Sequence, residues 1–320
     1  MSQHSMTCPH CDEGARSAGG APSPTCGHCG KPVSVCGGFR LGGEVGRGGV
    51  AIVREAKHAD GRDAVVKVLE RTAFNPWQVH QLFARSARLA QSFHHEGLPR
   101  VLGFERRGDR SFLAMEHLRG GTLSDRVVAG TRVQGAAFEE LLRRLLEAAA
   151  YLHERSMVHG DLTPRNVMFR TSRDSLPVLI DLDGLCSPSE RGLPSLVMTP
   201  GYTAPEQKVG EISVQSDLYG IGATMIYAST GRSPDSFMRG GSKLDIDLEL
   251  PGVSRRARAL VQRLVDLDPR RRPRSARNAL KTLAGNEDRV GRLATTLLAV
   301  AVILAVFITL AMATQASTLR

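Results

Sequence analysis

Aromatic side chains are scarce in this chain, where they make up 5% of the residues and include a single tryptophan. The scarcity matters most in residues 255–292, a basic stretch with twelve Lys or Arg, four acidic residues and no aromatic residue. Proteins that bind single-stranded nucleic acid stack the bases on aromatic rings between basic groups. We therefore expect no specific nucleic-acid partner. The stretch is either a solvated helical face or a basic surface that attracts polyanions such as anionic lipid.

The overall composition is 42% hydrophobic and 23% charged, with a formal net charge of +10 at pH 7. This balance is typical of a globular protein with a membrane segment. A length of 320 residues is enough for one domain with two lobes and short appendages.

No apolar run of the kind found in a cleavable signal peptide occurs in residues 1–30. We therefore expect the cysteines to lie in a reducing compartment, where a C-x-x-C pair indicates metal binding. Two such pairs occur, fourteen residues apart, and their members are Cys8, Cys11, Cys26 and Cys29. Four thiolates can surround a structural Zn²⁺ ion tetrahedrally. The pattern resembles a zinc ribbon, which we place at residues 1–37.

The alternative is a flexible arm with unligated thiols, whereas a redox pair would need a βαβ context that is absent. His10 and His28 lie inside the two pairs, and we do not expect them to be ligands. Because structural zinc sites have no open coordination position, we expect no chemistry here. The zinc ribbon is a candidate for binding an unknown protein, or it simply caps the chain.

Residues 159–166 read His-Gly-Asp-Leu-Thr-Pro-Arg-Asn. They resemble the catalytic loop of protein kinases, in which an Asp accepts the proton of the attacking hydroxyl and an Asn five residues later holds a metal ion. The resemblance gives these roles to Asp161 and Asn166. It extends over about residues 39–283 and is strongest to bacterial serine/threonine kinases, because further motifs of that family occur in the expected order.

The first of these motifs is a glycine cluster within an apolar alternation that predicts a β-hairpin from Phe39 to Lys57. It resembles the kinase Gly-rich loop, in which backbone amides approach the phosphates of ATP. Gly46 and Gly48 match its first two glycines, and Val53 matches the valine above the adenine. Lys67 lies in the following strand, Ala64–Leu69, and resembles the lysine that contacts the α- and β-phosphates.

Residues 111–123 resemble the hinge between the two kinase lobes, where Glu116 and Leu118 are expected to offer backbone groups to the adenine. The strand from Val178 ends in Asp181, which resembles the metal-binding Asp of the D-F-G motif; carboxylates suit Mg²⁺. Asp183 stands in place of the motif's glycine. We interpret it as a solvated turn residue, with an extra metal ligand as the alternative.

Residues 197–206 resemble the end of the activation segment, which forms the platform for a protein substrate. This segment favours a protein substrate over a small molecule. Two further matches predict structural contacts: Asp217 is expected to brace the catalytic loop, and Arg272 to pair with Glu206.

These resemblances imply an α+β, two-lobed protein-kinase-like fold at residues 38–284 that uses ATP and Mg²⁺ to phosphorylate serine or threonine of a protein. Lys67 positions the phosphates, Asp161 orients the hydroxyl, and Asn166 and Asp181 hold the metal.

Besides Asp183, four positions depart from the family pattern. The most serious is Ser86, where relatives carry the glutamate that pairs with the strand lysine; no acidic residue occurs between Glu70 and Glu96. The others are Gly160, Thr163 and Ala51, which replace an arginine, a lysine and the third loop glycine. They keep open the alternative of a pseudokinase, a membrane-tethered binding module. A small-molecule kinase is a third interpretation.

Residues 293–313 contain no charge and would span about 31 Å as a helix, which matches a bilayer core. We predict a transmembrane helix here, after a basic link at 285–292 and before a short tail at 314–320; the alternative is a buried core helix. Arg289 and Arg292 favour the preceding side inside. The expected location is therefore the cell inner membrane, single-pass, with the kinase domain cytoplasmic.

Overall fold

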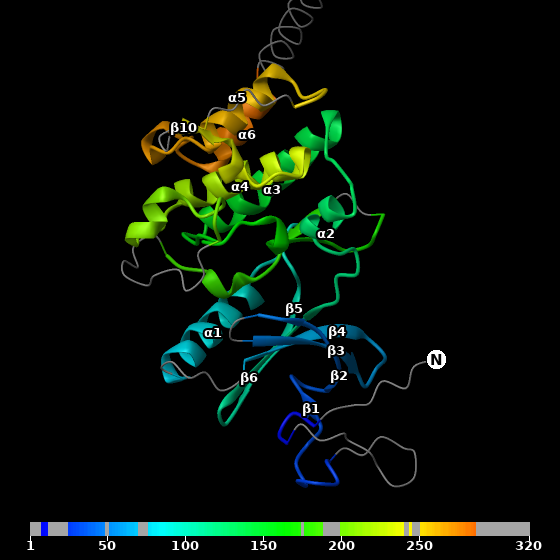
Figure 1. Cartoon of the computed structure of the whole chain (residues 1–320). Coiled ribbons are helices and arrows are strands. Elements are labelled where there is room, and N and C mark those ends of the chain that lie inside the picture. The colour runs from blue at the N-terminus through cyan, green and yellow to red at the C-terminus, as the bar shows by residue number, and fades with distance from the viewer. Residues whose placement is uncertain are drawn as a thin grey trace, which may run out of the picture.

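The computed structural model describes residues 8–11, 25–48, 51–69, 76–173, 176–187, 199–239, 243–244 and 250–285. Strands dominate the first half of this part and helices the second (Figure 1). The two sets of elements form two lobes, and the chain crosses between them after strand β6. This arrangement confirms the α+β, two-lobed fold.

The N-terminal lobe is built on one antiparallel sheet of six strands in the order β1-β2-β3-β4-β6-β5. The strands are β1 Ser34–Val35, β2 Phe39–Arg47, β3 Ala51–His58, β4 Asp63–Leu69, β5 Val101–Arg107 and β6 Arg110–Glu116. Helix α1, Pro76–Gln91, packs on β5 and β6. The hairpin predicted from the glycine cluster is therefore present as β2 and β3.

Strand β4 shows why this lobe holds together. Its alternating residues Ala64, Val66 and Val68 are buried against Phe112 of β6 in one apolar cluster. The residues between them point to the other face, as the two-residue period of a strand requires. Lys67 is one of these, so the strand directs its ammonium group toward the gap between the lobes.

The C-terminal lobe consists of helices around a large apolar core. The helices are α2 Leu123–Val128, α3 Gly135–His153, α4 Val214–Thr230, α5 Arg255–Leu264 and α6 Ala276–Ala284. Short strand pairs are β7 Val167–Phe169 with β8 Pro177–Leu179, and β9 Met238–Arg239 with β10 Lys243–Leu244. Single 3-10 turns occur at Pro164–Asn166 (η1), Leu182–Gly184 (η2), Pro205–Val209 (η3), Pro234–Phe237 (η4) and Pro269–Arg271 (η5).

Helix α4 is apolar on nearly all sides, and almost all of its residues are buried. A helix with this composition belongs in a core. It lies beneath the loop that contains Asp161, and Gly220 allows the close approach: a Cβ there would lie 2.7 Å from the carbonyl oxygen of Leu162. The catalytic loop therefore rests directly on a helix that is almost fully buried.

The described part of the basic stretch forms α5, η5 and α6. Apolar residues of α5 such as Leu260 and Leu264 are buried, while its arginines lie on the opposite face. Some arginines have structural partners: Arg256 donates to the carbonyls of Leu283 and Ala284. This is the arrangement expected of a solvated helical face, and what the face binds stays a prediction.

Within the described ranges, no helix has both the length and the apolar character needed to cross a membrane. The predicted transmembrane helix, residues 293–313, and the links on either side of it lie outside the described residues.

Candidate active site

A cavity of about 380 Å³ lies between the two lobes and collects most of the residues predicted from sequence. Its roof comes from β2, β3 and β4, its rear from α1 and β6, and its floor from the loops around η1 and η2. Predicted residues on its lining are Gly46, Val53, Lys67, Glu116, Leu118, Asn166 and Asp181.

The cavity also has an apolar slot, of which the sequence predicted Val53 but neither Val65 nor Met168. Val65 of β4 and Met168 of β7 line it together with Val53. Val65 lies two residues before Lys67 and so shares its face of the strand, which is a signal that was available in the sequence. Two aliphatic side chains above and a thioether below suit a flat aromatic ring such as adenine.

The glycine-rich turn between β2 and β3 is partly described. Gly46 pairs with Val53 across the hairpin, and the N–H of Gly48 donates to the carbonyl of Ala51 at 2.8 Å. Ala51, the replacement for the third glycine, is buried in an apolar cluster with Leu69 and Phe83. The substitution therefore adds to the packing of the hairpin.

At the hinge, Glu116 turns its carboxylate away from the cavity. That group accepts from Arg170 at 3.1 Å and from the backbone N–H of Arg100 at 3.0 Å. With its carboxylate so engaged, Glu116 keeps its main chain for a bound base; that Glu116 and Leu118, which both line the cavity, contact adenine stays a prediction.

Asp217 braces the catalytic loop from below, as the sequence predicted. Its carboxylate accepts from the backbone N–H groups of His159 and Gly160, at 2.8 and 2.9 Å, and its partner on α3 is His153 Nε2 at 2.9 Å. Asp217 itself is almost fully buried. Because Gly160 has φ = 80°, the loop uses a backbone conformation that glycine adopts without steric cost.

Asp161 and Asn166 form a connected pair within the loop. Asn166 Nδ2 donates to the carboxylate of Asp161 at 2.8 Å and to its carbonyl at 2.9 Å. The hydroxyl of Thr199, from the end of the activation segment, lies 3.3 Å from the other carboxylate oxygen. Burial raises the pKa of Asp161, and the nearby Asp181 raises it further. A carboxylate so placed is a better proton acceptor than one in water.

Asp181 follows strand β8 and adopts φ = 63° and ψ = 62°, a left-handed conformation that is rare for a residue with a side chain. Strain of this kind collects at functional sites. Here it turns the carboxylate toward the cavity, where its side chain is 42% exposed.

Lys67 reaches two carboxylates of the same loop. Its Nζ lies 2.7 Å from Asp181 Oδ1 and 2.6 Å from Asp183 Oδ2. Burial lowers the pKa of Lys67, but Asp183 and Asp181 outweigh it, so the pKa is raised and the lysine stays charged. The interpretation of Asp183 as a solvated turn residue is therefore wrong, because its side chain faces the ammonium group.

Ser86 on α1 occupies the position of the missing glutamate and is 4% exposed. Its hydroxyl donates to the backbone carbonyl of Asp183 at 3.2 Å. Helix α1 contains no acidic residue. The helix thus contacts the loop after β8 but supplies no charge to Lys67.

The four predicted zinc ligands converge at the far end of the N-terminal lobe. Sulfur–sulfur distances are 3.6 Å for Cys8 and Cys29 and 3.7 Å for Cys11 and Cys26, and all four sulfurs lie within 4.8 Å of one another. A tetrahedral site with Zn–S bonds of about 2.3 Å requires separations of about 3.8 Å. The backbone N–H groups of Cys29 and His28 lower the pKa of Cys26 to about 6. The donor set and its geometry fit Zn²⁺.

The cysteine cluster is docked on the hairpin of β5 and β6. Arg110 donates to the carbonyl of Pro9 at 2.9 Å, and Arg107 lies 3.3 Å from Nε2 of His10. His10 thus faces the lobe, in agreement with the expectation that it is no ligand.

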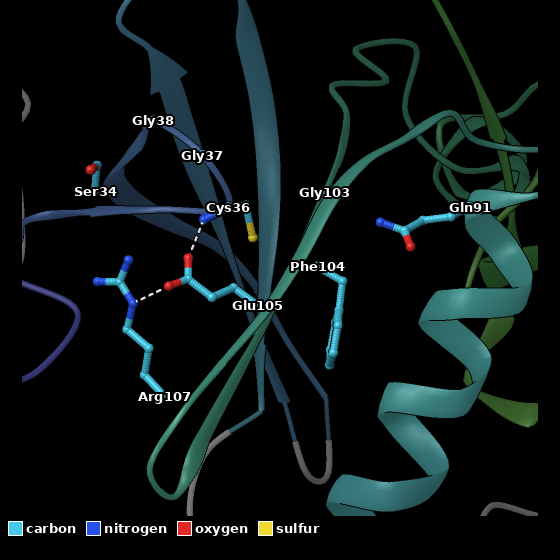
Figure 2. Close-up of a pocket in the computed structure, with 9 residues that line it drawn as sticks. All are labelled: Ser34, Cys36, Gly37, Gly38, Gln91, Gly103, Phe104, Glu105 and Arg107. Carbon is cyan, nitrogen blue, oxygen red and sulfur yellow. Dashed lines mark hydrogen bonds and ion pairs between the residues drawn. The ribbon is translucent and has the colours of Figure 1, made fainter.

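A second, wider cavity of about 580 Å³ lies beside this junction, along β5 (Figure 2). Its charged groups are engaged with each other: Glu105 pairs with Arg107 and accepts from the N–H of Cys36 at 2.6 Å. Burial raises the pKa of the Cys36 thiol to about 12, so this thiol is no nucleophile at neutral pH.

Lys67, Asp181 and Asn166 on the lining of a cavity with an apolar slot, together with the half-buried Asp161 that Asn166 contacts, suit phosphoryl transfer from a nucleotide. The comparisons with known proteins agree. The sequence matches the protein kinase domain over residues 39–283, and the chain therefore belongs to the protein kinase family.

Among curated relatives, serine/threonine-protein kinase pkn2 of Myxococcus xanthus is 31% identical over 268 residues, which cover 77% of this chain and 32% of the relative. Serine/threonine-protein kinase C of Synechocystis sp. is 29% identical over 272 residues, which cover 79% of this chain and 50% of the relative. The chain thus spans half or less of the length of these relatives. The crystal structure of Rad53 1-466 in complex with AMP-PNP is similar with a TM-score of 0.61 at 26% identity, covering 76% of this chain and 64% of that one.

Proposed function

We propose that this protein transfers the γ-phosphoryl group of ATP to serine or threonine of a protein substrate. The observation that carries the proposal is the convergence of Lys67, Asn166 and Asp181 on one cavity with an apolar slot, with Asp161 hydrogen-bonded to Asn166 beside it. Positioning and charge neutralisation provide most of the catalysis in this reaction, so a small set of groups is sufficient.

Each residue has a role that follows from its place. Lys67 holds the phosphates, while Asn166 and Asp181 are the groups that would hold Mg²⁺, which neutralises charge on the transferred phosphoryl group. Asp161 accepts the proton of the substrate hydroxyl. Val53, Val65 and Met168 enclose the base.

A protein substrate is supported by the anchored end of the activation segment. Thr199 contacts the carboxylate of Asp161, and Glu206 of η3 is held in the core of the C-terminal lobe by Arg272. The segment that would form the substrate platform therefore begins beside Asp161, the proposed proton acceptor, and ends at Glu206, which Arg272 fixes in the lobe. A small-molecule kinase would have no use for this arrangement.

The test is phosphoryl transfer by the 320-residue chain, purified in detergent, with γ-labelled ATP, Mg²⁺ and casein. We expect label on serine or threonine, and its loss in Asp161→Asn. The matched control is Asp60→Asn, which changes an exposed aspartate in the turn between β3 and β4. Equal labelling by Asp161→Asn and the wild type would contradict the proposal.

The second candidate is a pseudokinase that acts as a binding module. Ser86, Gly160 and Thr163 favour it, since each replaces a charged residue of the active-kinase pattern. In the same assay this candidate predicts no transfer by the wild type, with nucleotide binding unaffected by Asp161→Asn.

We further propose that the cysteine cluster holds one structural Zn²⁺ and that residues 293–313 anchor the chain in the inner membrane, with the kinase domain on the cytoplasmic side. The sulfur geometry supports the first proposal, and the uncharged sequence and its arginine flank support the second. The anchor is tested by alkaline extraction of membranes: the whole chain should stay with the membrane, and a chain ending at residue 290 should be released. Retention of the shortened chain would contradict the anchor.

A further inference from the structure

We propose that Asp183 is the positioning residue of Lys67 and replaces the glutamate that helix α1 lacks. This inference rests on the proposed phosphoryl-transfer function and names the group that makes Lys67 competent for it. In most protein kinases the lysine is held by a glutamate on the helix that corresponds to α1. Here the anion comes from the loop after β8.

The geometry of the ion pair supports this assignment. The Nζ–Oδ2 distance of 2.6 Å is that of a charge-assisted hydrogen bond, and the lysine side chain is only 13% exposed. Asp183 is itself part-buried, with 30% of its side chain exposed. A pair so shielded from water is screened less than a surface ion pair. Asp183 therefore restricts a flexible four-carbon side chain to one direction.

The charge balance of the site also supports Asp183 as the positioning residue of Lys67. A typical kinase site holds one lysine, the helix glutamate and the metal-binding aspartate. This site holds Lys67, Asp183 and Asp181, which gives the same number of charges of each sign. One carboxylate stands on the loop in place of the one on the helix, and the formal charge of the three groups is the same.

Asp181 cannot fill the role of Asp183. Asp181 is a residue that would hold the metal, so a bound metal would compete with Lys67 for its carboxylate. Asp183 lies two residues further along, within the 3-10 turn of Leu182–Gly184, and would keep the ammonium group in place. Without Asp183, Lys67 would have no carboxylate to position it when the nucleotide is bound.

Ser86 fits the same arrangement. Its hydroxyl holds the backbone carbonyl of Asp183 at 3.2 Å, so α1 steadies the loop that carries the anion. A glutamate at this buried position would place a third carboxylate beside Asp181 and Asp183. We therefore expect Ser86→Glu alone to lower activity, whereas it would raise activity if the missing charge had no replacement.

The first experiment is a double-mutant cycle on ADP binding without Mg²⁺, measured by calorimetry on the 320-residue chain. Asp183→Asn should weaken ADP binding about 10-fold, because a mispositioned lysine loses its phosphate contact. In a Lys67→Met background, Asp183→Asn should have no further effect. The control is Asp60→Asn, which should bind ADP as the wild type does.

The second experiment exchanges the two positions. Ser86→Glu with Asp183→Gly restores the family's arrangement, a helix glutamate and a loop glycine. The single variants should lower kcat by about 10- to 100-fold, and the double variant should recover to within a few-fold of wild type. A residue with a merely structural role would give additive losses.

Three outcomes would overturn the proposal. The first is an ADP affinity in Asp183→Asn equal to that of the Asp60→Asn control, and the second is a loss of ADP affinity on Asp183→Asn that is as large in the Lys67→Met background as in the wild type. The third is an altered Mg²⁺ requirement with unchanged metal-free ADP binding. The last result would make Asp183 a metal ligand. If the wild type transfers no phosphate, the proposed function fails, but the ADP cycle still decides the role of Asp183. A wild type that binds no ADP overturns both.

Discussion

Glu206 and Arg272 form a two-pronged ion pair in the interior of the C-terminal lobe, with N–O distances of 2.6 and 3.0 Å. The guanidinium group is fully buried and also donates to the carbonyls of Asp266 and Gln215, at 2.7 and 2.9 Å. Ser216 completes the shell of the carboxylate at 3.1 Å. With these partners in place, neither charge is left uncompensated, and η3 is fixed to the base of α4.

Removing one partner of this pair should destabilise the protein strongly. Arg272→Met leaves the buried carboxylate of Glu206 without its counter-charge, and the loss of such a charge costs about 3–5 kcal/mol. Denaturant unfolding measures the difference. The control is Asp268→Asn, which breaks the exposed pair with Arg270 and should cost less than about 1 kcal/mol. Similar losses in the two variants would contradict the prediction.

Gln207 links the activation segment to the catalytic loop, and we predict that this link needs an amide. Its Nε2 donates to the carbonyl of Gly160 at 2.8 Å, and its Oε1 accepts from the N–H of Ala204 at 2.9 Å. Gln207→Glu keeps the acceptor but loses the donor, which leaves a buried carbonyl unsatisfied at a cost of about 1–3 kcal/mol. Thermal unfolding should show the loss, and the rate of phosphoryl transfer should fall with it. The control is Gln215→Glu, at a half-buried glutamine whose amide donates to the carbonyl of Arg274, away from the catalytic loop; an equal effect there would refute the link.

His80 should make the protein sensitive to mild acid. It is buried on α1 beside the hydroxyl of Ser111, at 2.9 Å, and burial followed by the charge of Arg106 lowers its pKa. A pKa that is lower in the folded state means that the unfolded state binds more protons below about pH 6.5. Stability is therefore lost as the pH falls through this region.

His80→Gln should remove that part of the pH dependence, which has a slope of at most about 1.4 kcal/mol per pH unit. Free energies of unfolding for the variant and the wild type, compared between pH 7.5 and 5, check this. His94→Gln, at an exposed histidine, should leave the slope unchanged. A wild-type slope that persists in His80→Gln would show that other groups cause it.

Metal removal should affect the cysteine cluster before the kinase lobes. Its apolar core consists of little more than Val33 and the cysteines themselves, so its fold depends on the bound ion. A chelating dye should report about one Zn²⁺ per chain, Cys8→Ala should abolish it, and Cys36→Ala should not. Cys36 lies outside the group of four sulfurs and has its own contact with the carbonyl of Phe112, at 3.4 Å. Full zinc content in Cys8→Ala would disprove the assignment.

The sequence predicted those parts of the fold that belong to short sequence motifs with a defined role. The hairpin before Lys67, the brace from Asp217 and the pairing of Arg272 with Glu206 follow from local motifs, and the structure confirms them. Residues 293–313 lie outside the described chain, so the transmembrane helix stays a prediction.

What the sequence could not provide are contacts that depend on how distant segments approach. Asp183 looked like a turn residue because three-letter motifs say nothing of where a carboxylate points after the strand ends. Its partner, Lys67, lies 116 positions earlier on β4, and the two approach because α1 packs both on the sheet and against η2. The spacing of the cysteines likewise does not predict that the cluster docks on Arg107 and Arg110.

Strand β1 determines where the N-terminus of this protein can be truncated. The family match begins at residue 39, but Ser34 and Val35 already pair with β2, and Val35 is fully buried beneath the sheet. A recombinant kinase domain cut at that boundary would leave the outer edge of β2 open and a hole beneath it. Exposed strand edges pair with other chains, so such a preparation should aggregate for a reason unrelated to catalysis.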